Sequence, residues 1–183
     1  CSVQGTATPG IESSVKYLGF TFVGGPLHRG YVAHQREYTE ELVSTWGMTN
    51  AKPLFVVGEK PPGQEGVSGG AGSDKPVPGE GVAIDQGLLR LAQKLCGSLL
   101  WLYTRSRPDI AFGVSRMAAI ATKDPEQSVA IGKNMLRYLR GTVGVGLEIA
   151  PTESQIVAYA DASFEVRGSQ TGVAVFYGDA CVA

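Results

Sequence analysis

The spacing of hydrophobic positions changes twice along this chain of 183 residues. Residues 15–23 are rich in β-branched and aromatic side chains and are followed by Gly-Gly-Pro, and a second short apolar segment spans residues 30–34. These two segments predict strands that pair as a hairpin with a loose loop. From residue 35 the apolar positions recur at helical spacing as far as Gly47, so we expect a helix that ends at this glycine.

Residues 88–141 carry the pattern of three further helices. The first has leucines at spacings of three and four, which predicts one buried face: Leu88, Leu91, Leu95, Leu99 and Leu102. It should end before Pro108, because a proline disfavours helical geometry in the residue that precedes it. The second helix starts near Pro108, and its expected inner face is Ile110, Val114, Met117, Ala118 and Ala121. The third has a clear start signal, with Asp124 as the cap and Pro125 in the first turn, and should end at Gly141.

Two other regions complete the expected fold. Residues 58–87 are rich in Gly and Pro and have few large apolar side chains, which predicts a flexible linker or a long surface loop. Strand candidates follow the helices at residues 145–149, 155–161 and 172–177. The expected fold class is therefore α/β of the α+β kind, with a β-hairpin and a helix, a flexible linker, a helical connection and antiparallel strands.

Charge is distributed unevenly, although the net charge is only −1. Residues 88–141 carry nine basic and three acidic side chains, a net charge of +6, and the segments on either side are acidic. A basic segment of this kind is associated with binding to polyanions. Solvated helix faces give the same pattern, and charge alone does not choose between the two explanations.

Cysteine usage and hydropathy exclude several classes of protein. Cys1, Cys96 and Cys181 are far apart and form no C-x-x-C pair, which argues against a disulfide framework or a zinc site and favours a reducing, intracellular compartment. No apolar run approaches the ~18 residues of a membrane span, and no secretory signal opens the chain. Because the chain starts at Cys1 and ends directly after a strand candidate, we expect a piece excised from a longer protein.

Several short sequence motifs along the chain, called phrases below, are more specific evidence of a family than hydrophobic periodicity. The helical region contains Leu95-Cys96-Gly97-Ser98-Leu99-Leu100-Trp101-Leu102, Arg105-Ser106-Arg107-Pro108-Asp109-Ile110-Ala111 and Leu136-Arg137-Tyr138-Leu139-Arg140-Gly141-Thr142. The flanking regions contain Tyr17-Leu18-Gly19-Phe20, His34-Gln35-x-x-Tyr38, Gly47-Met48, Tyr159-Ala160-Asp161-Ala162-Ser163 and Ser169-Gln170-Thr171-Gly172. In this order they resemble the Pol polyprotein of copia-type (Pseudoviridae-like) retrotransposons, from the end of the reverse transcriptase to the start of RNase H. The resemblance covers about residues 15–57 and 88–183.

The chain departs from the family pattern in three places. Ser106 stands where the family usually has Thr, and residues 125–128 replace a Pro that is followed closely by His-Trp. The segment 58–87 is also longer and richer in Gly than the family pattern. These departures are typical of a divergent copy.

The resemblance implies a domain organisation and an activity for the parent protein. Its ranges are 1–57 for the end of the reverse transcriptase palm and the following helix, 58–87 for the linker, 88–154 for the helical connection and 155–183 for truncated N-terminal strands of an RNase H-like domain. The parent would copy RNA into DNA and hydrolyse the RNA of RNA–DNA hybrids. Its implied partners are an RNA–DNA hybrid or a primer–template duplex and the rest of Pol, in the cytoplasm, the nucleus or a virus-like particle.

Asp161 is the one residue for which the resemblance implies catalysis. RNase H enzymes hold two divalent ions with a cluster of carboxylates, and the hard oxygens of that cluster suit Mg²⁺. Asp161 follows an apolar strand, where the first of these carboxylates is expected; the alternative is that it caps the following turn. Glu165 and Asp179 match no family position. Because the other acids and the polymerase Tyr-x-Asp-Asp are expected outside this chain, it should be catalytically incomplete by itself.

Candidate contacts to nucleic acid come from basic residues and one glycine. Three basic residues share one face of the third helix: Lys133, Arg137 and Arg140. They could follow duplex phosphates without sequence specificity, or form a solvated face near the helix end. Arg105 and Arg107 are further candidates. Gly19 lies in a segment that resembles the primer-gripping hairpin of reverse transcriptases, where it would let a nucleic-acid backbone approach; a core strand is the alternative.

Two other functions fit the same sequence. The chain could be a non-catalytic transposon relic or a co-opted nucleic-acid-binding module, or a helical scaffold with no nucleic-acid role. Trp46 and Trp101 lie on apolar helical stripes, so we expect them in the core and not as base-stacking platforms. His28 and His34 have no metal-ligand spacing and are given no role.

Overall fold

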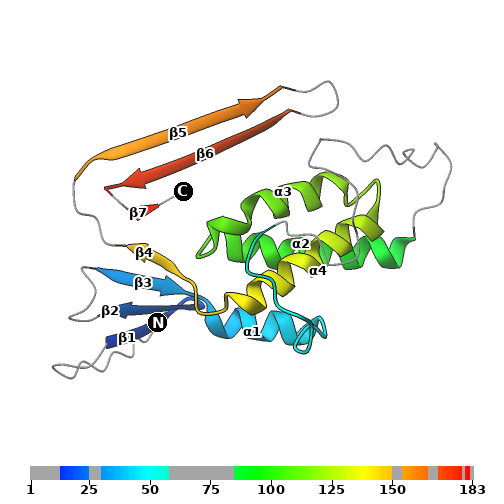
Figure 1. The fold of residues 1–183 in the computed structure, drawn as a ribbon, viewed down its shortest axis with the longest axis horizontal. Helices are drawn as coiled ribbons and strands as arrows, with labels where there is room; N and C mark the ends of the chain where they lie inside the picture. Colours follow the sequence, from blue (N-terminus) through cyan, green and yellow to red (C-terminus); the bar gives the residue numbers. More distant parts are fainter. Residues whose placement is uncertain are drawn as a thin grey trace. The chain divides into compact units, whose positions relative to one another are not determined.

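A computed structural model of this chain describes residues 13–24, 30–57, 85–149, 154–164, 169–178 and 180–181 (Figure 1). Within these residues the chain forms two antiparallel sheets and four α-helices, which confirms the expected α+β class. The predicted linker at 58–87 lies outside the described residues as far as residue 84.

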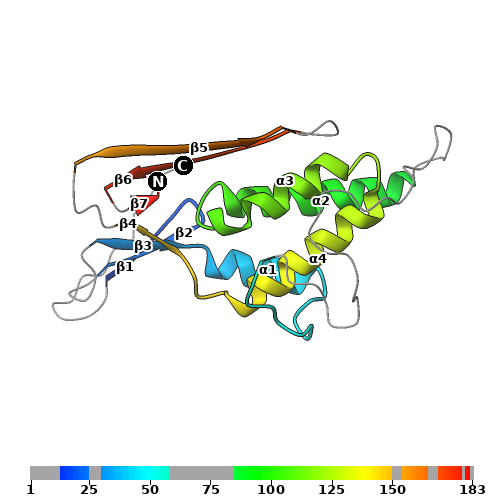
Figure 2. The same cartoon turned by 45° about the horizontal axis from the view of Figure 1, so that its top comes forward.

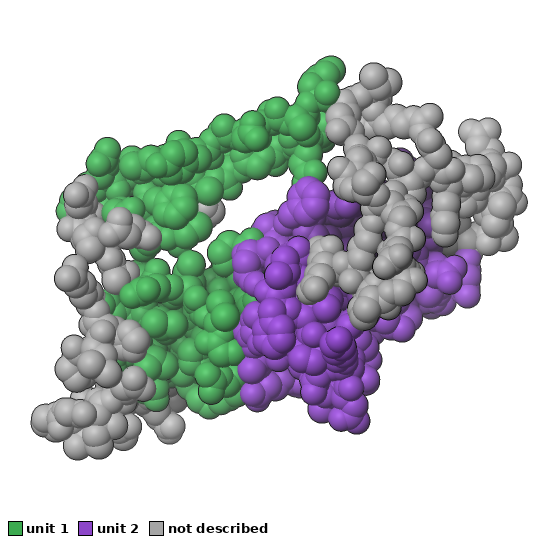
Figure 3. Space-filling view, viewed as in Figure 1, with its two compact units in different colours: residues 1–38, 104–108, 144–183 green, residues 39–103, 109–143 purple. Residues whose placement is uncertain are grey.

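The chain divides into two compact units that alternate along the sequence (Figure 3). Unit 1 comprises Cys1–Tyr38, Thr104–Pro108 and Gly144–Ala183, and unit 2 comprises Thr39–Tyr103 and Asp109–Val143. Both sheets belong to unit 1, and three of the helices belong to unit 2. The four domain ranges given above follow from the resemblance and stay a prediction.

The first sheet has four strands in the order β1-β2-β3-β4. They span Ser13–Tyr17, Phe20–Gly24, Tyr31–His34 and Leu147–Ile149, and each pairs antiparallel with its neighbour. The single strand predicted at residues 15–23 is wrong, because a two-residue turn divides it. Leu18 and Gly19 have φ values of 48° and 81°, and positive φ at both central residues is the requirement of a type I′ turn. An apolar leucine is unusual there, so the turn was hidden within an apolar run.

Strand β4 joins the sheet from a distant part of the chain. It pairs with β3 in a register that places Ile149 opposite Tyr31 and Leu147 opposite Ala33. The second sheet consists of β5 (Ile156–Ser163), β6 (Gln170–Tyr177) and β7 (Ala180–Cys181), with β5 and β6 forming a long antiparallel hairpin (Figure 1). The strand candidates at 155–161 and 172–177 are therefore confirmed, and each is longer than its apolar core.

Helix α1 (Arg36–Thr45) ends as the sequence predicted. Gly47 has a φ of 64°, its N–H donates to the Ser44 carbonyl at 2.9 Å, and the Met48 N–H donates to the Val43 carbonyl at 2.9 Å. These two hydrogen bonds around a left-handed residue form a Schellman motif, which favours glycine because it has no Cβ.

The other helices are α2 (Gln86–Tyr103), α3 (Ala111–Ile120) and α4 (Pro125–Gly141), with a 3-10 turn at Pro108–Ile110 before α3. The predicted start of α4 is confirmed, since Oδ1 of Asp124 accepts from the Gln127 N–H at 2.9 Å. Helix α2 starts two residues earlier than predicted, because Oδ1 of Asp85 accepts from the Gly87 N–H at 2.7 Å and caps it.

Helices α2, α3 and α4 pack against one another around the core of unit 2 (Figure 2). The buried residues of this core are Ala92, Leu95, Leu99, Leu102, Ile110, Val114, Met117, Ala121, Val129, Met135, Leu136 and Leu139. Two predicted core residues, Leu91 and Ala118, are exposed instead. Leu91 is followed by the buried Ala92, and Ala118 is preceded by the buried Met117, so each exposed residue lies at the edge of the buried face of its helix.

Candidate nucleic-acid interface

The C-terminal half of α4 holds the chain segment that follows α1. Nε of Arg137 donates to the Lys52 carbonyl at 2.8 Å, and Arg140 donates to the Ala51 carbonyl. In return, the Leu54 N–H donates to the Arg137 carbonyl at 3.1 Å, and the Leu54 side chain is buried. Two cationic side chains thus satisfy backbone carbonyls of an irregular segment that has no strand or helix partner of its own.

This contact changes the meaning of the basic face predicted on α4. Lys133, Arg137 and Arg140 do share one face, but only Lys133 is exposed, and the two arginines are half-buried. A guanidinium carries five N–H donors, so Arg137 and Arg140 keep donors for other acceptors. The positions of these two arginines are nevertheless set by their hydrogen bonds to the segment after α1. Among the contacts described, Lys133 makes no hydrogen bond of this kind.

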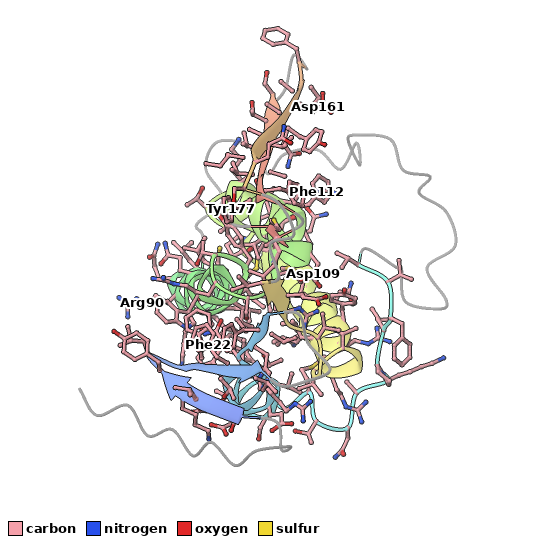
Figure 4. The ribbon with its side chains drawn as sticks, turned by 90° about the vertical axis from the view of Figure 1, so that its left-hand side faces the viewer. Phe22, Arg90, Asp109, Phe112, Asp161 and Tyr177 are labelled. Atoms are coloured by element: carbon pink, nitrogen blue, oxygen red, sulfur yellow. The ribbon has the colours of Figure 1, made fainter. Side chains whose placement is uncertain are left out.

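A second contact joins α4 to the turn before α3. The hydroxyl of Tyr138 donates to Oδ2 of Asp109 at 2.7 Å (Asp109 is labelled in Figure 4). A hydrogen bond to a charged acceptor is stronger than one between neutral groups. Neither this pair nor the Arg137 and Arg140 contacts could be predicted from sequence patterns, because the partners are far apart along the chain and follow no common period.

The two remaining basic candidates lie in the loop between α2 and the 3-10 turn, and they differ in solvent exposure. Arg105 is exposed, whereas Arg107 is only 2% exposed. The neighbouring Ser106 is buried too, and its hydroxyl donates to Oε1 of the buried Gln35 at 2.9 Å. Arg107 therefore does not present its guanidinium to a phosphate in this structure, and its predicted contact role is not supported by its position. Charge pattern could not reveal this, because a buried arginine and an exposed one look alike in sequence.

Gly19 lies at the tip of the β1–β2 hairpin. Its φ of 81° explains the glycine by turn geometry alone, and a Cβ built there would meet nothing within 4 Å among the described residues. Beside the turn is an open hollow of about 210 Å³. Its lining residues are Lys16, Tyr17, Leu18, Gly19, Phe20, Thr21, Gln35, Arg36 and Glu37. The expectation that a nucleic-acid backbone approaches Gly19 stays a prediction.

Charges beside this hollow act on two titratable groups. A hydrogen bond from Lys16 to Glu37, together with the lysine's charge, lowers the pKa of the Glu37 carboxyl. Burial lowers the pKa of the His34 imidazole, the charge of Arg36 lowers it further, and Glu37 acts in the opposite direction. The Arg36 N–H also donates to Nδ1 of His34 at 3.4 Å. Burial and the Arg36 charge thus favour the neutral imidazole, whose Nδ1 accepts this hydrogen bond at the start of α1.

Asp161 lies on β5, opposite Gly172 on β6 (Figure 4). Its side chain is exposed, and Oδ1 accepts from the N–H of the next residue, Ala162, at 2.9 Å. The alternating directions of strand side chains place it on the same face as Tyr159 and Phe176, whose rings meet edge to face at 5.9 Å between centroids. β5 continues to Ser163 beyond this carboxylate, and residues 165–168 lie outside the described residues, so both roles expected for Asp161 stay predictions.

The donor set around Asp161 does not fit a two-metal centre. The described part of the chain contains no group of three or more His, Cys, Asp or Glu side chains that could hold a metal ion. Two-metal hydrolysis needs a cluster of carboxylates to hold both ions, and a single exposed carboxylate does not supply one. Glu165 and Asp179 lie outside the described residues. We therefore assign no hydrolytic step to the residues described.

The prediction that Trp101 lies in the core is wrong. This side chain is 41% exposed, whereas Trp46 is half-buried. Trp101 lies on the side of α2 opposite Leu95 and Leu99, although it adjoins the buried Leu102 in sequence. Counting 3.6 residues per turn from the buried leucines would have shown this outward position.

Comparison with known proteins gave no match: no family model fits the chain, and no curated protein or solved structure is significantly similar to it. Among the helices that the structure describes, none is long and apolar enough to cross a bilayer.

The contact between α4 and the segment after α1 makes Gly141 sensitive to substitution. A Cβ at this position would clash with the backbone carbonyl of Leu54, which cannot move as a flexible side chain would. We expect Gly141→Ala to lower the free energy of unfolding by about 1–3 kcal/mol, measured by urea denaturation. The matched control is Gly97→Ala, where the new Cβ meets nothing within 4 Å and should stabilise α2 by up to about 1 kcal/mol. A Gly141→Ala protein as stable as the wild type would contradict the close approach.

The charges around His34 predict opposite effects of two neighbouring substitutions. NMR titration should give a pKa for His34 below its usual 6.5, and Arg36→Gln should raise that pKa while Glu37→Gln should lower it. Because the folded chain then binds this proton less readily than the unfolded chain, the free energy of unfolding should fall as pH drops below 6.5. A pKa for His34 at or above 6.5, or shifts of the same sign in both variants, would refute the assignment.

Proposed function

We propose that this chain is the part of a copia-type retrotransposon Pol polyprotein that connects the reverse transcriptase to its RNase H domain. In the parent enzyme, its contribution is to help hold an RNA–DNA hybrid or a primer–template duplex. The single observation that carries the proposal is that two pairs of these phrases, far apart in sequence, are joined by side-chain hydrogen bonds: Tyr138 to Asp109 and Ser106 to Gln35.

Unit 2 supplies most of these contacts. The phrase at residues 136–142 contributes Tyr138, which donates a hydrogen bond to Asp109 of the phrase at 105–111. The same phrase contributes Arg137 and Arg140, which donate to the backbone carbonyls of residues 52 and 51, shortly after Gly47-Met48. The residue types in these phrases thus have a shared physical task. Such contacts are expected if the phrases come from one family fold, and they are not expected if each phrase resembles the family by chance.

One departure from the family pattern also favours a functional copy over a relic. Ser106 stands where the family usually has Thr, yet it keeps a hydroxyl and donates it to Gln35 at 2.9 Å inside unit 1. A relic without selection would have no reason to retain this buried hydrogen bond, since a buried polar group that loses its partner destabilises the fold. The helical scaffold without a nucleic-acid role remains the rival that experiment must exclude.

The parent's chemistry needs more than this chain describes. Asp161 would supply one carboxylate to a Mg²⁺-binding cluster in the complete RNase H domain, and the other carboxylates would come from elsewhere in Pol. The role proposed for the chain itself is therefore to bind and position nucleic acid. Lys133 on α4 and Arg105 in the loop after α2 are the exposed cations of the predicted contact set, and contacts from cations to phosphates give affinity without sequence preference.

Binding of the chain to an RNA–DNA hybrid as a function of salt tests this role. If Lys133 contacts a phosphate, Lys133→Gln should reduce the log–log salt slope by about 0.9, and Arg105→Gln should do the same independently. Gln is nearly as good a helix former as Lys, so the circular dichroism spectrum should not change. Lys123→Gln, which removes another exposed cation, is the matched control and should leave the slope unchanged. Equal slopes in all four proteins would remove the hybrid-binding role.

A further inference from the structure

The outward side of α2 carries four residues that the proposed function does not use. Arg90, Lys94, Gly97 and Trp101 follow one another at spacings of four, three and four, so they form a single stripe along the helix. All four are exposed, and they lie opposite the buried Leu95 and Leu99. Arg90 projects outward from the helix in Figure 4. We call these four residues the outer stripe of α2.

Gly97 is the unexplained member of the outer stripe. Glycine is the poorest helix former after proline, so a glycine in the middle of an 18-residue helix needs a reason. Packing explains the glycines within α3 and α4: a Cβ would lie 2.6 Å from Sδ of Met135 at Gly113, and it would clash with Leu95 at Gly132. At Gly97 a Cβ would meet nothing within 4 Å among the described residues. The missing side chain therefore serves no contact inside the described structure, which points to a partner whose backbone approaches α2 here.

The charge of α2 limits what that partner can be. The helix has no acidic residue, and Arg90 and Lys94 lie four residues apart, where two like charges repel each other. The acid that precedes α2 in sequence, Asp85, already accepts hydrogen bonds as the cap of the helix. A polyanion would relieve the repulsion between the two cations. A second copy that docked through the same face of α2 would oppose cation to cation, so charge complementarity favours the polyanion.

Trp101 indicates which polyanion fits. Arg90 and Lys94 are about 6 Å apart along the helix axis, and Trp101 lies about 10 Å beyond Lys94. An exposed indole beside two cations is the combination that binds single strands, because bases that are not paired can stack on an aromatic ring while the cations follow the phosphates. In a duplex the bases are stacked on each other and are not accessible to the indole.

We infer that the outer stripe of α2 is a binding site for single-stranded nucleic acid. Arg90 and Lys94 contact phosphates, the strand passes closely over Gly97, and a base stacks on Trp101. The site uses none of the residues assigned to hybrid binding in the proposed function. An experiment can therefore contradict single-strand binding or hybrid binding without contradicting the other.

The experiment measures binding of the full chain to a fluorescein-labelled 20-nucleotide oligo-dT and to a hybrid duplex of the same length. Arg90→Gln/Lys94→Gln should reduce the log–log salt slope for oligo-dT by about 1.4, because each phosphate contact on a single strand contributes about 0.7. Trp101→Ala should weaken oligo-dT binding roughly five- to 150-fold, the range expected for one stacked base. The matched control is Arg116→Gln/Lys123→Gln, which removes two exposed cations of the same unit and should change neither quantity.

Two further measurements separate binding from folding. Gly97→Gln should keep or raise the melting temperature, since Gln is the better helix former, and yet weaken oligo-dT binding by blocking the close approach. In a Trp46→Phe background Trp101 is the sole tryptophan, and its fluorescence should be quenched when oligo-dT binds.

Three results would overturn the inference. The first is oligo-dT affinity that is unchanged in the outer-stripe variants or reduced equally in the Arg116/Lys123 control. The second is an equal loss of binding to the hybrid, which would indicate contacts to duplex phosphates without stacking. The third is self-association of the wild-type chain at sedimentation equilibrium that is lost in the outer-stripe variants, which would identify a second copy as the partner. Lys133→Gln, which tests the proposed function, should leave oligo-dT binding unaltered.

Discussion

The hydrogen bonds from Arg137 and Arg140 to the carbonyls of Lys52 and Ala51 are the constraint on which unit 2 depends. The segment after α1 contains no helix or strand, and the two guanidinium groups and the Arg137 carbonyl supply hydrogen bonds that hold its backbone against α4. Gly141 allows the segment to lie against α4, and Leu54 can then enter the apolar interior. The bond between Tyr138 and Asp109 fixes the same helix to the turn before α3. Of the five positions from Arg137 to Gly141, all except Leu139 thus serve contacts to segments distant in sequence.

Sequence reasoning succeeded where a structure depends on neighbouring residues. The Asp124 cap and the end of α1 at Gly47 follow from side-chain chemistry and backbone conformation within one turn, and both were predicted. It failed where contacts join distant parts of the chain, as in the pairing of β3 with β4 and the bonds of Arg137. The turn at Leu18 was missed for another reason, because an apolar residue occupied a position that usually takes Asn, Asp or Gly.

The residues predicted to contact nucleic acid differ in burial, and a charge pattern in the sequence does not show which of them are buried. Of the basic candidates, Lys133 and Arg105 are exposed, Arg137 and Arg140 serve unit 2 as well, and Arg107 lies in the interior. Asp161 was placed correctly on a strand after an apolar run, but one carboxylate among the described residues does not make a metal centre. The net charge of +6 over residues 88–141 therefore describes two populations of cations, and the exposed population includes Arg90 and Lys94 on α2. Trp101 is exposed beside these cations although it is apolar, because its position around the helix axis decides which way it faces.

The measurement that tests the central role of α4 most directly is site-resolved amide hydrogen exchange at Leu54. Its N–H donates to the Arg137 carbonyl, so it should be protected in the wild-type chain although it lies in a segment without helix or strand. In Arg137→Gln/Arg140→Gln, protection at Leu54 should fall sharply while amides in the middle of α4, such as that of Leu136, remain protected. Exchange of the Leu54 amide at the rate of an unstructured chain in the wild type, or no change in the double variant, would contradict this role of the two arginines.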